Sequence, residues 1–313
     1  MIPTSCSIAL QPIMNDLYLS LLLMLLLSLA AFIQGVRLQR GQYRRWAPLV
    51  IYGACGLMLI YLAVVWDRPV IVWLLPFSSA VVLGNCLPVF GSLYAGICLG
   101  AAAIPWYRRI FLSTSLLALG VFSLVRPLTG EAPVCVPTVS GGTFQSQSTL
   151  YTCSAACAAG VLRMHGITAS EAEMAELCLT RQGTHWLGVY RGLKLKTAGT
   201  NLDVVVRRVS GAELGSASTG SGVLSLTFHG SAAGRRNCET VFNSESGHSV
   251  ICLGPAGEGR INVFDPAPDF GFECWNRNHL QDVANGILLE LVNREDGSRA
   301  EPVSLQIASL RPL

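Results

Sequence analysis

Charged side chains are scarce in this sequence: they make up 13% of its 313 residues, against roughly 25% in an ordinary soluble domain. We therefore do not expect the whole chain to fold as one soluble globule. The few basic residues form no patch with aromatic residues between them, which argues against nucleic acid as a partner. The phosphate-binding loop GxxxxGK[ST] is also absent, so the sequence shows no ATPase of the P-loop type.

Two further absences concern ions. The long apolar runs contain no ionisable residue except at their ends, so the sequence shows no proton relay or ion path across a membrane. No CxxC or HxxxH pair supports a metal site. Cys153 and Cys157 could place two ligands on one face of a helix, and His248 and Cys252 could place two on one face of a strand. We accordingly expect neither a metal nor another cofactor.

What the sequence has instead is a marked division at Arg126. The residues up to that point carry eight arginines and two acidic residues, whereas the rest carries 14 basic and 17 acidic residues. The first part holds long apolar runs, and the second is long enough for one domain with a sizeable core. We divide the chain into a transmembrane region over residues 1–126, a linker over 127–144 rich in Pro, Gly, Ser and Thr, and a domain over 145–313.

The apolar runs of the first part predict five membrane spans. About 20 apolar residues cross a bilayer core as a helix, and such runs cover Leu17–Ile33, Ala47–Trp66, Pro69–Trp106 and Ile110–Val125. The third run is too long for one crossing and is interrupted near Gly84–Gly91, so we expect two helices there. The first run lacks the basic flank and cleavage site of a signal peptide, so we expect it to remain attached.

The orientation of these spans is left open by the sequence. Positively charged loops stay in the cytoplasm, which places the loop Arg37–Arg45 there, and five crossings then put the domain in the cytoplasm as well. That arrangement leaves Arg108 and Arg109 outside. If half of Pro69–Trp106 only re-enters the membrane, the domain moves outside, where the six cysteines after Arg126 other than Cys153 could form disulfide bridges.

The spacing of apolar residues changes along residues 145–313 and predicts helices first and strands second. Helical spacing covers Cys153–Met164, a capping-box pattern at Thr168–Glu171 opens a helix through Leu179, and a third helix covers His185–Lys196. Beyond Gly199 the apolar residues alternate, which predicts strands at Leu202–Val209, Leu224–Phe228, Ser249–Leu253, Arg260–Phe264 and Ile287–Val292. This order favours an α+β fold with an antiparallel sheet.

Three residues of this domain form a candidate catalytic set. Cys153 begins a helix, where unpaired N–H groups and the helix dipole lower the pKa of a thiol and favour the nucleophilic thiolate. His248 begins one strand and Asp265 ends the next, so a hairpin would place these two side chains in contact. The aspartate would then orient the imidazole, and the histidine would take the thiol proton, as nucleophilic catalysis requires.

Gln147 adds a fourth candidate. It lies six residues before Cys153 and can reach back over the start of the helix with its side-chain amide. Together with a backbone N–H of the Cys153 turn, this amide could donate to the oxyanion of an acyl-transfer reaction. Cys153 taken alone would be interpreted as a buried structural cysteine. The ordered set of Gln147, Cys153, His248 and Asp265 favours the catalytic interpretation.

The motifs around these residues resemble peptidase family C39, the papain-like cysteine peptidase module best known at the N-termini of bacteriocin exporters. The resemblance covers about Gln145–Val292 and rests on Gln147-x5-Cys153, Gly183-Thr184, Gly247-His248 and Phe264-Asp265-Pro266. It implies a nucleophile at Cys153, a general base at His248, an orienting Asp265 and an oxyanion donor at Gln147. The sequence departs from the family pattern at Thr152 and Ser154, and its apolar helices come before the domain rather than after it.

The resemblance also implies an activity and a location. It implies a cysteine peptidase that hydrolyses peptide or protein substrates, with leader peptides of exported chains as candidates, and the apolar runs before the domain predict that this peptidase is membrane-anchored. The chain would lie in the lipid bilayer of a bacterial cytoplasmic membrane, with a separately encoded exporter as a candidate partner. Two alternatives remain: an inactive C39-like module that holds peptides for such an exporter, and a transamidase that passes the acyl group to an amine.

Overall fold

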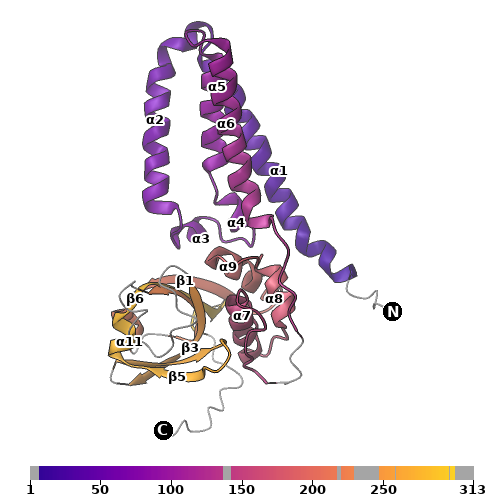
Figure 1. Ribbon diagram of the computed structural model, residues 1–313, viewed down its shortest axis with the longest axis vertical. Coiled ribbons are helices and arrows are strands. Elements are labelled where there is room, and N and C mark those ends of the chain that lie inside the picture. The colour runs from indigo at the N-terminus through magenta and orange to yellow at the C-terminus, as the bar shows by residue number, and fades with distance from the viewer. Residues whose placement is uncertain are drawn as a thin grey trace. The chain divides into compact units, whose positions relative to one another are not determined.

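The fold is that of a computed structural model, which describes residues 7–136, 142–216, 220–228, 247–257, 259–295 and 297–299. The chain divides into two compact units, Met1–Thr129 and Gly130–Leu313. The first unit consists of helices, and the second combines helices with a sheet (Figure 1).

Long apolar segments form the helices of the first unit. Its elements are α1 (Ser7–Leu38), α2 (Ala47–Ile60), α3 (Val70–Leu74), α4 (Ala80–Leu83), α5 (Leu87–Gly100) and α6 (Trp106–Val125), with helical turns at Gly41–Trp46, Tyr61–Val65 and Arg126–Leu128. Four stretches in the described part of the chain are long and apolar enough to cross a membrane: Asn15–Leu38, Tyr43–Val65, Ala80–Gly100 and Trp106–Leu128. A helix is suited to lipid because it satisfies every backbone polar group internally.

The prediction of five spans is wrong, because the run Pro69–Trp106 supplies one candidate crossing rather than two. Its first part forms only α3, which has 5 residues, and then an irregular segment around Pro76 that leads into α4. Proline has no N–H to donate and interrupts a helix at such a position. The second part of the run, Ala80–Gly100, is the stretch long enough to cross. Apolar composition alone did not separate a short helical turn from a span.

Glycine residues bring α1 and α5 into close contact. A Cβ atom placed on Gly35 would overlap the Leu93 carbonyl of α5, and one placed on Gly96 would overlap the Phe32 carbonyl of α1. Small residues at such positions let two helix backbones approach each other in a membrane, where lipid is as apolar as the side chains and no hydrophobic force drives association. The α1–α5 contact therefore has no room for added side-chain volume.

We expect Gly96→Leu to destabilise the helical unit, because a leucine side chain has no space between α1 and α5. Overpacking of this kind costs about 1–3 kcal/mol, and more where backbone atoms must move. Gly53→Leu on α2 is the matched control, since nothing lies within 4 Å of a Cβ placed on Gly53. Thermal unfolding of the full chain in detergent micelles measures both variants. Equal melting temperatures for the two would contradict the close α1–α5 packing.

In the described part of the second unit three helices precede the sheet: α7 (Cys153–Met164), α8 (Glu171–Leu177) and α9 (Trp186–Lys196). The described residues form six strands, β1 (Leu202–Val209), β2 (Gly222–Phe228), β3 (His248–Gly257), β4 (Arg260–Asp265), β5 (Gly271–Trp275) and β6 (Val283–Asn293). They make one antiparallel sheet in the order β1-β6-β2-β3-β4-β5. Short helices α10 (Gly211–Leu214) and α11 (Arg277–Gln281) lie between strands in the chain. The predicted order of helices before an antiparallel sheet is confirmed.

The sequence prediction differs from the structure in several element bounds, among them the start of α8, and it omits β5. The N-cap of α8 is Ser170, whose side-chain oxygen accepts the Glu173 N–H at 3.1 Å, and not Thr168. Strand β5 has no clear sequence signal, because its apolar residues Phe272 and Trp275 fall on opposite faces and do not alternate with polar ones. Pairing with β4 makes this segment a strand.

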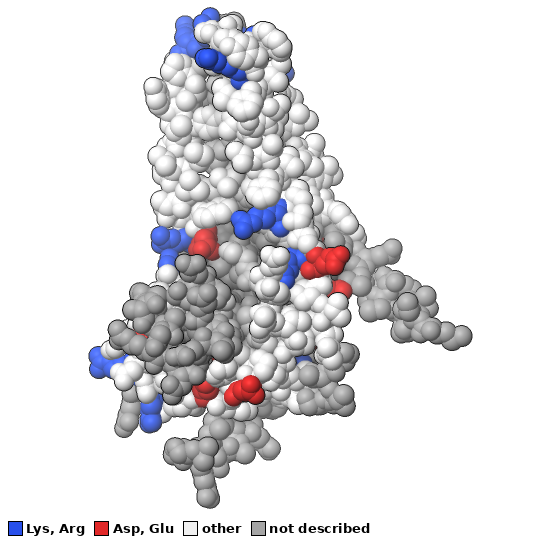
Figure 2. Space-filling view, in the orientation of Figure 1, with Lys and Arg blue, Asp and Glu red and all other residues white. Residues whose placement is uncertain are grey.

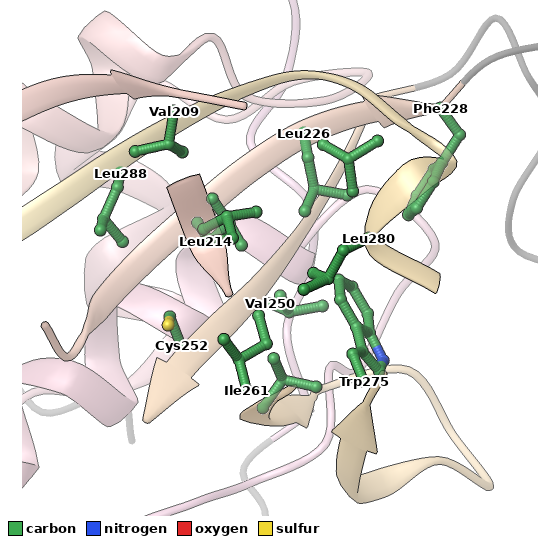
Figure 3. Packing of buried hydrophobic residues seen from close by; sticks show 13 residues of the cluster. Val209, Leu214, Leu226, Phe228, Val250, Cys252, Ile261, Trp275, Leu280 and Leu288 are labelled. Carbon is green, nitrogen blue, oxygen red and sulfur yellow. The ribbon is translucent and has the colours of Figure 1, made fainter. Parts of the chain in front are cut away.

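The two faces of the sheet pack against different partners. Successive side chains of a strand point to opposite faces, and Val250 of β3 belongs to the buried apolar cluster drawn in Figure 3, together with Leu224 and Trp275. Its neighbour Ile251 lies against Gly160 of α7 on the other side. Helix α7 is buried from its second residue onward along nearly its whole length. Its small Ala and Gly side chains let it lie close to β3.

Candidate active site

Cys153 is the first residue of α7, and its side chain is partly exposed whereas the residues that follow it are buried. The loop before it is tied by Thr152, which is completely buried. The Thr152 hydroxyl donates to the Thr149 carbonyl at 3.0 Å and accepts from the Thr149 N–H at 3.1 Å. These bonds hold the thiol at a helix N-terminus, where the dipole favours a thiolate.

The structure brings His248 and Asp265 together. Strand β3 begins at His248, β4 ends at Asp265, and the two strands pair with Ile251 opposite Phe264, so the start of one lies beside the end of the other. His248 Nε2 donates to Asp265 Oδ1 at 2.9 Å, and both side chains are buried. The Ala267 N–H donates to the same oxygen at 2.8 Å. The carboxylate thus fixes the ring and leaves Nδ1 as the nitrogen for the thiol.

A hydrogen bond joins Cys153 to His248 and connects three side chains in a series. Burial acts to raise the pKa of the Cys153 thiol, but the hydrogen bond and the positive charge of His248 outweigh it, so this pKa lies below its ordinary value. Burial acts to lower the pKa of His248, but hydrogen bonds and negative charge from Asp265 and Cys153 raise it to about 9. Both shifts favour a thiolate and an imidazolium at neutral pH.

Three serine hydroxyls continue this series into the sheet. Ser154 Oγ lies 4.0 Å from the Cys153 sulfur and 2.8 Å from Ser249 Oγ. Ser249 Oγ lies 3.0 Å from the hydroxyl of Ser225, its direct partner in the register of β2 and β3. The Ser249 backbone also bonds the Cys153 sulfur, and this bond and the Ser154 hydroxyl both lower the thiol pKa.

No sequence pattern pointed to a role for these serines, and Ser154 stood out only as a departure from the family pattern. The signal that could have identified them is the position of Ser249, a hydroxyl directly after the candidate base and at the head of the apolar run Val250–Leu253, which the structure shows to be buried. A buried hydroxyl needs a hydrogen-bond partner, and this requirement points to other polar groups nearby.

We expect Ser249→Ala to raise the pH at which Cys153 becomes reactive, because the Ser154 hydroxyl then loses the partner that holds it. The loss of one such bond, about 1 kcal/mol, limits the effect to at most about fivefold slower alkylation near neutral pH. The variant keeps the backbone bond of residue 249 to the sulfur. Iodoacetamide labelling across pH measures the effect, with Ser225→Ala at the far end of the series as the control with the smaller shift. An unchanged profile in Ser249→Ala would assign these serines to packing alone.

Gln147 is anchored beside the turn that follows Asp265. Its backbone N–H donates to the Pro266 carbonyl at 2.7 Å, and its side-chain Nε2 donates to the Thr149 carbonyl at 2.8 Å. The side chain is 7% exposed, and its Oε1 has no hydrogen-bond partner among the described residues. An amide nitrogen carries two hydrogens, so Nε2 has a second one that can serve an acceptor outside this loop.

Glu171 also restrains this loop. It is the first residue of α8, is 6% exposed, and accepts the Ser148 N–H on Oε1 at 2.8 Å. Ser148 directly follows Gln147, so this bond fixes the peptide next to the candidate oxyanion donor. The sequence pattern predicted only a helix-cap position for Glu171, because the contact with Ser148 arises from tertiary packing.

The buried cysteines differ chemically from Cys153. Burial raises the pKa of the Cys157 thiol well above its ordinary range, that of Cys178 to about 12 and that of Cys252 to about 11. Cys157 donates from its sulfur to the Ser249 carbonyl at 3.3 Å. These thiols are therefore neutral near pH 7 and are poor nucleophiles.

Neither a metal site nor a disulfide is found in the described ranges of the chain. No three His, Cys, Asp or Glu side chains within those ranges gather closely enough to hold a metal ion. Of the six cysteines considered for bridges, Cys238 lies outside the described residues. The other five are free thiols: Cys135, Cys157, Cys178, Cys252 and Cys274.

Comparison with known proteins gives limited similarity. No protein-family model matches the sequence, and no curated protein matches it. The peptidase domain of Streptococcus ComA, described as a bi-functional ABC transporter involved in a quorum-sensing pathway, is similar at 18% identity and a TM-score of 0.37, over 46% of this chain and 95% of that domain. The peptidase domain of Streptococcus mutans ComA is similar at 15% identity and a TM-score of 0.32, over 47% and 98%. Similarities this low do not assign a function, so the geometry of the site has to support one.

Proposed function

We propose that this chain is a membrane-anchored cysteine peptidase with a papain-like domain of the C39 type. The observation that supports the proposal is the hydrogen-bonded series of Cys153, His248 and Asp265, in which the pKa shifts of the thiol and the imidazole favour their charged forms. In this proposal residues 1–126 anchor the chain in a bacterial membrane, 127–144 form a linker and 145–313 form the peptidase domain.

Acylation begins at the Cys153 sulfur, which attacks the carbonyl carbon of a peptide bond as a thiolate. The carbonyl oxygen takes up the negative charge, and the backbone N–H groups at the start of α7 stabilise it together with the second amide hydrogen of Gln147. His248 gives its Nδ1 proton to the nitrogen of the leaving group, so the C–N bond breaks and a neutral amine departs. Asp265 holds the ring in place by its bond to Nε2.

Deacylation returns the enzyme to its starting state. His248, now neutral at Nδ1, takes a proton from water while the water oxygen attacks the thioester carbon. The C–S bond then breaks, the peptide acid leaves, and the thiolate and imidazolium are restored. One water is consumed for each peptide bond cut.

Product masses from a peptide library test the proposal. The full chain, purified in detergent, is incubated with the library, and every product is identified by mass spectrometry. Hydrolysis gives fragment pairs whose summed mass exceeds that of the parent peptide by one water, which supports the peptidase. Products in which one peptide has been joined to the amine of another would overturn it in favour of a transamidase. Peptides that bind but keep their masses would overturn it in favour of an inactive binding module.

A further inference from the structure

Hydrogen bonds between the helices of the first unit define which loops share an end of the bundle. Tyr94 of α5 donates from its hydroxyl to the Ile51 carbonyl of α2 at 3.3 Å. Tyr61, directly after α2, donates from its hydroxyl to the carbonyl of Gly84, shortly before α5, at 2.7 Å. Going from the first contact to the second, the residue numbers rise along α2 and fall along α5. These two helices are therefore antiparallel, and the end of α2 lies beside the start of α5.

Two further hydrogen bonds show the direction of α6 relative to α5. Ser113 donates from its hydroxyl to the Ala95 carbonyl at 2.8 Å, and Asn85 donates from its side-chain amide to the Ser123 carbonyl at 2.9 Å. Here the numbers rise in α6 as they fall toward the start of α5. Helix α6 is therefore antiparallel to α5 and finishes beside the start of α5.

Helix α1 runs parallel to α5. Gly96 of α5 lies against Phe32, and four residues later Gly100 lies against Gln39. The loops 39–46 and 101–105 consequently share one end of the bundle, which we name the loop end. The segment 66–79 and Arg126 share the opposite end, which we name the linker end, and Asp16 lies there too because its carboxylate accepts the Ser78 hydroxyl at 2.8 Å.

Positive charge is concentrated at the loop end. The helix termini and loops there contain no acidic residue and six arginines, namely Arg37, Arg40, Arg44, Arg45, Arg108 and Arg109. The linker end has two residues of each sign, namely Asp16, Asp67, Arg68 and Arg126. Figure 2 shows basic side chains at the upper end of the bundle and an uncharged surface along the visible flank of the helices.

We infer that the loop end faces the cytoplasm and that the peptidase unit lies on the non-cytoplasmic side of the membrane. Arginines in short loops near membrane spans determine which ends stay in the cytoplasm. Helix α6 finishes at the linker end, and the chain continues from Arg126 into the second unit. With four spans the loop Arg37–Arg45 and the pair Arg108 and Arg109 lie on the same side, so the conflict that five spans create does not arise.

Aromatic side chains agree with spans that end at these positions. Trp46 and Trp106 are exposed at the loop end, and Trp66 and Trp73 are exposed at the linker end. Tryptophan is enriched at both membrane–water interfaces, where its ring fits the headgroup layer.

This topology limits which substrates can reach the proposed peptidase, and that part of the inference rests on the proposed function. A site on the non-cytoplasmic side meets polypeptides that have crossed the membrane, and it does not meet chains still in the cytoplasm. The substrates are therefore exported polypeptides that are cut after their scissile bond has crossed the membrane.

Thiol labelling in intact bacteria tests the topology without any substrate. A small membrane-impermeant maleimide is added to cells that express the full chain with the substitution Ala103→Cys, and labelled peptides are identified by mass spectrometry. Ala103 is exposed in the loop 101–105 at the loop end, and the native Cys274 is exposed in the second unit. We expect Cys274 to be labelled in intact cells and the thiol at position 103 only after permeabilisation. The reverse pattern, or equal labelling of both positions in intact cells, would overturn the inference.

A second measurement separates this inference from the proposed function. New protein N-termini are compared between cells that express the wild-type chain and cells that express Cys153→Ala. Cysteine-dependent cuts in exported proteins support the substrate class, and such cuts confined to cytoplasmic proteins would overturn it. If Cys274 is labelled from outside but no N-terminus depends on Cys153, the topology stands and the proposed peptidase falls.

Discussion

Replacing Cys153 with alanine is expected to abolish peptide hydrolysis, with a loss of at least about 1,000-fold, and to leave the fold intact. The Cys153 sulfur forms the acyl bond in the proposed mechanism, and alanine offers no nucleophile. The substitution should cost little stability, because Cys153 is the partly exposed first residue of α7 and alanine is a strong helix former. Turnover of library peptides measures the activity, and the melting temperature of the full chain verifies the fold.

Cys157→Ala is the matched control for this prediction. It makes the same substitution one helical turn later, at a fully buried thiol whose pKa is raised by burial. We expect it to retain activity within a few-fold of the wild type. His248→Ala should lose about as much as Cys153→Ala, and the double variant should lose no more than either, because the two side chains act as one unit. Near wild-type turnover in Cys153→Ala would show that the catalytic assignment is wrong.

Asp265→Asn is expected to move the alkaline limit of activity to lower pH. His248 must be protonated to release the amine, and its pKa is raised to about 9 by Asp265 and Cys153, so wild-type activity should persist up to that pH and be lost above it. Asparagine can still accept a hydrogen bond but carries no charge, and the pKa of His248 then falls toward its ordinary 6.5. If the pKa falls that far, the protonated fraction near pH 8 drops about 30-fold.

The pH profile of kcat/KM measures this shift, because it reports the ionisations of the free enzyme. Asp269→Asn is the matched control: the residue is exposed four positions along the chain and has a φ of 74°, a conformation that asparagine tolerates. Its profile should coincide with that of the wild type. An alkaline limit that stays near 9 in Asp265→Asn would mean that another group holds the proton on His248.

Local patterns were enough to locate the elements that carry the site. The helix over Cys153–Met164 and the strand over Leu202–Val209 have the bounds that their spacing predicts. The contact between His248 and Asp265 follows from the same kind of pattern, because two consecutive strands joined by a short turn have few ways to pair. Such predictions succeed because each depends on residues that are close in the chain.

The supporting contacts of the site could not be predicted in this way. The hydroxyl of Ser225 reaches Ser249 only because β2 and β3 pair in one register, and the carboxylate of Glu171 reaches Ser148 only because α8 lies beside the loop before α7. Each partner is 23 or 24 positions away along the chain. No periodicity of one segment carries information about such a partner.

The membrane region shows the same limit. Composition and charge were enough to place long apolar runs within residues 1–126 and to show arginines clustered between them, because both properties belong to each segment alone. The structure reduced Pro69–Trp106 to one candidate span, and the packing of the helices placed the loops 39–46 and 101–105 at the same end. The shared end rests on which carbonyls Tyr61, Tyr94 and Asn85 reach, and these contacts join segments that are far apart in the chain.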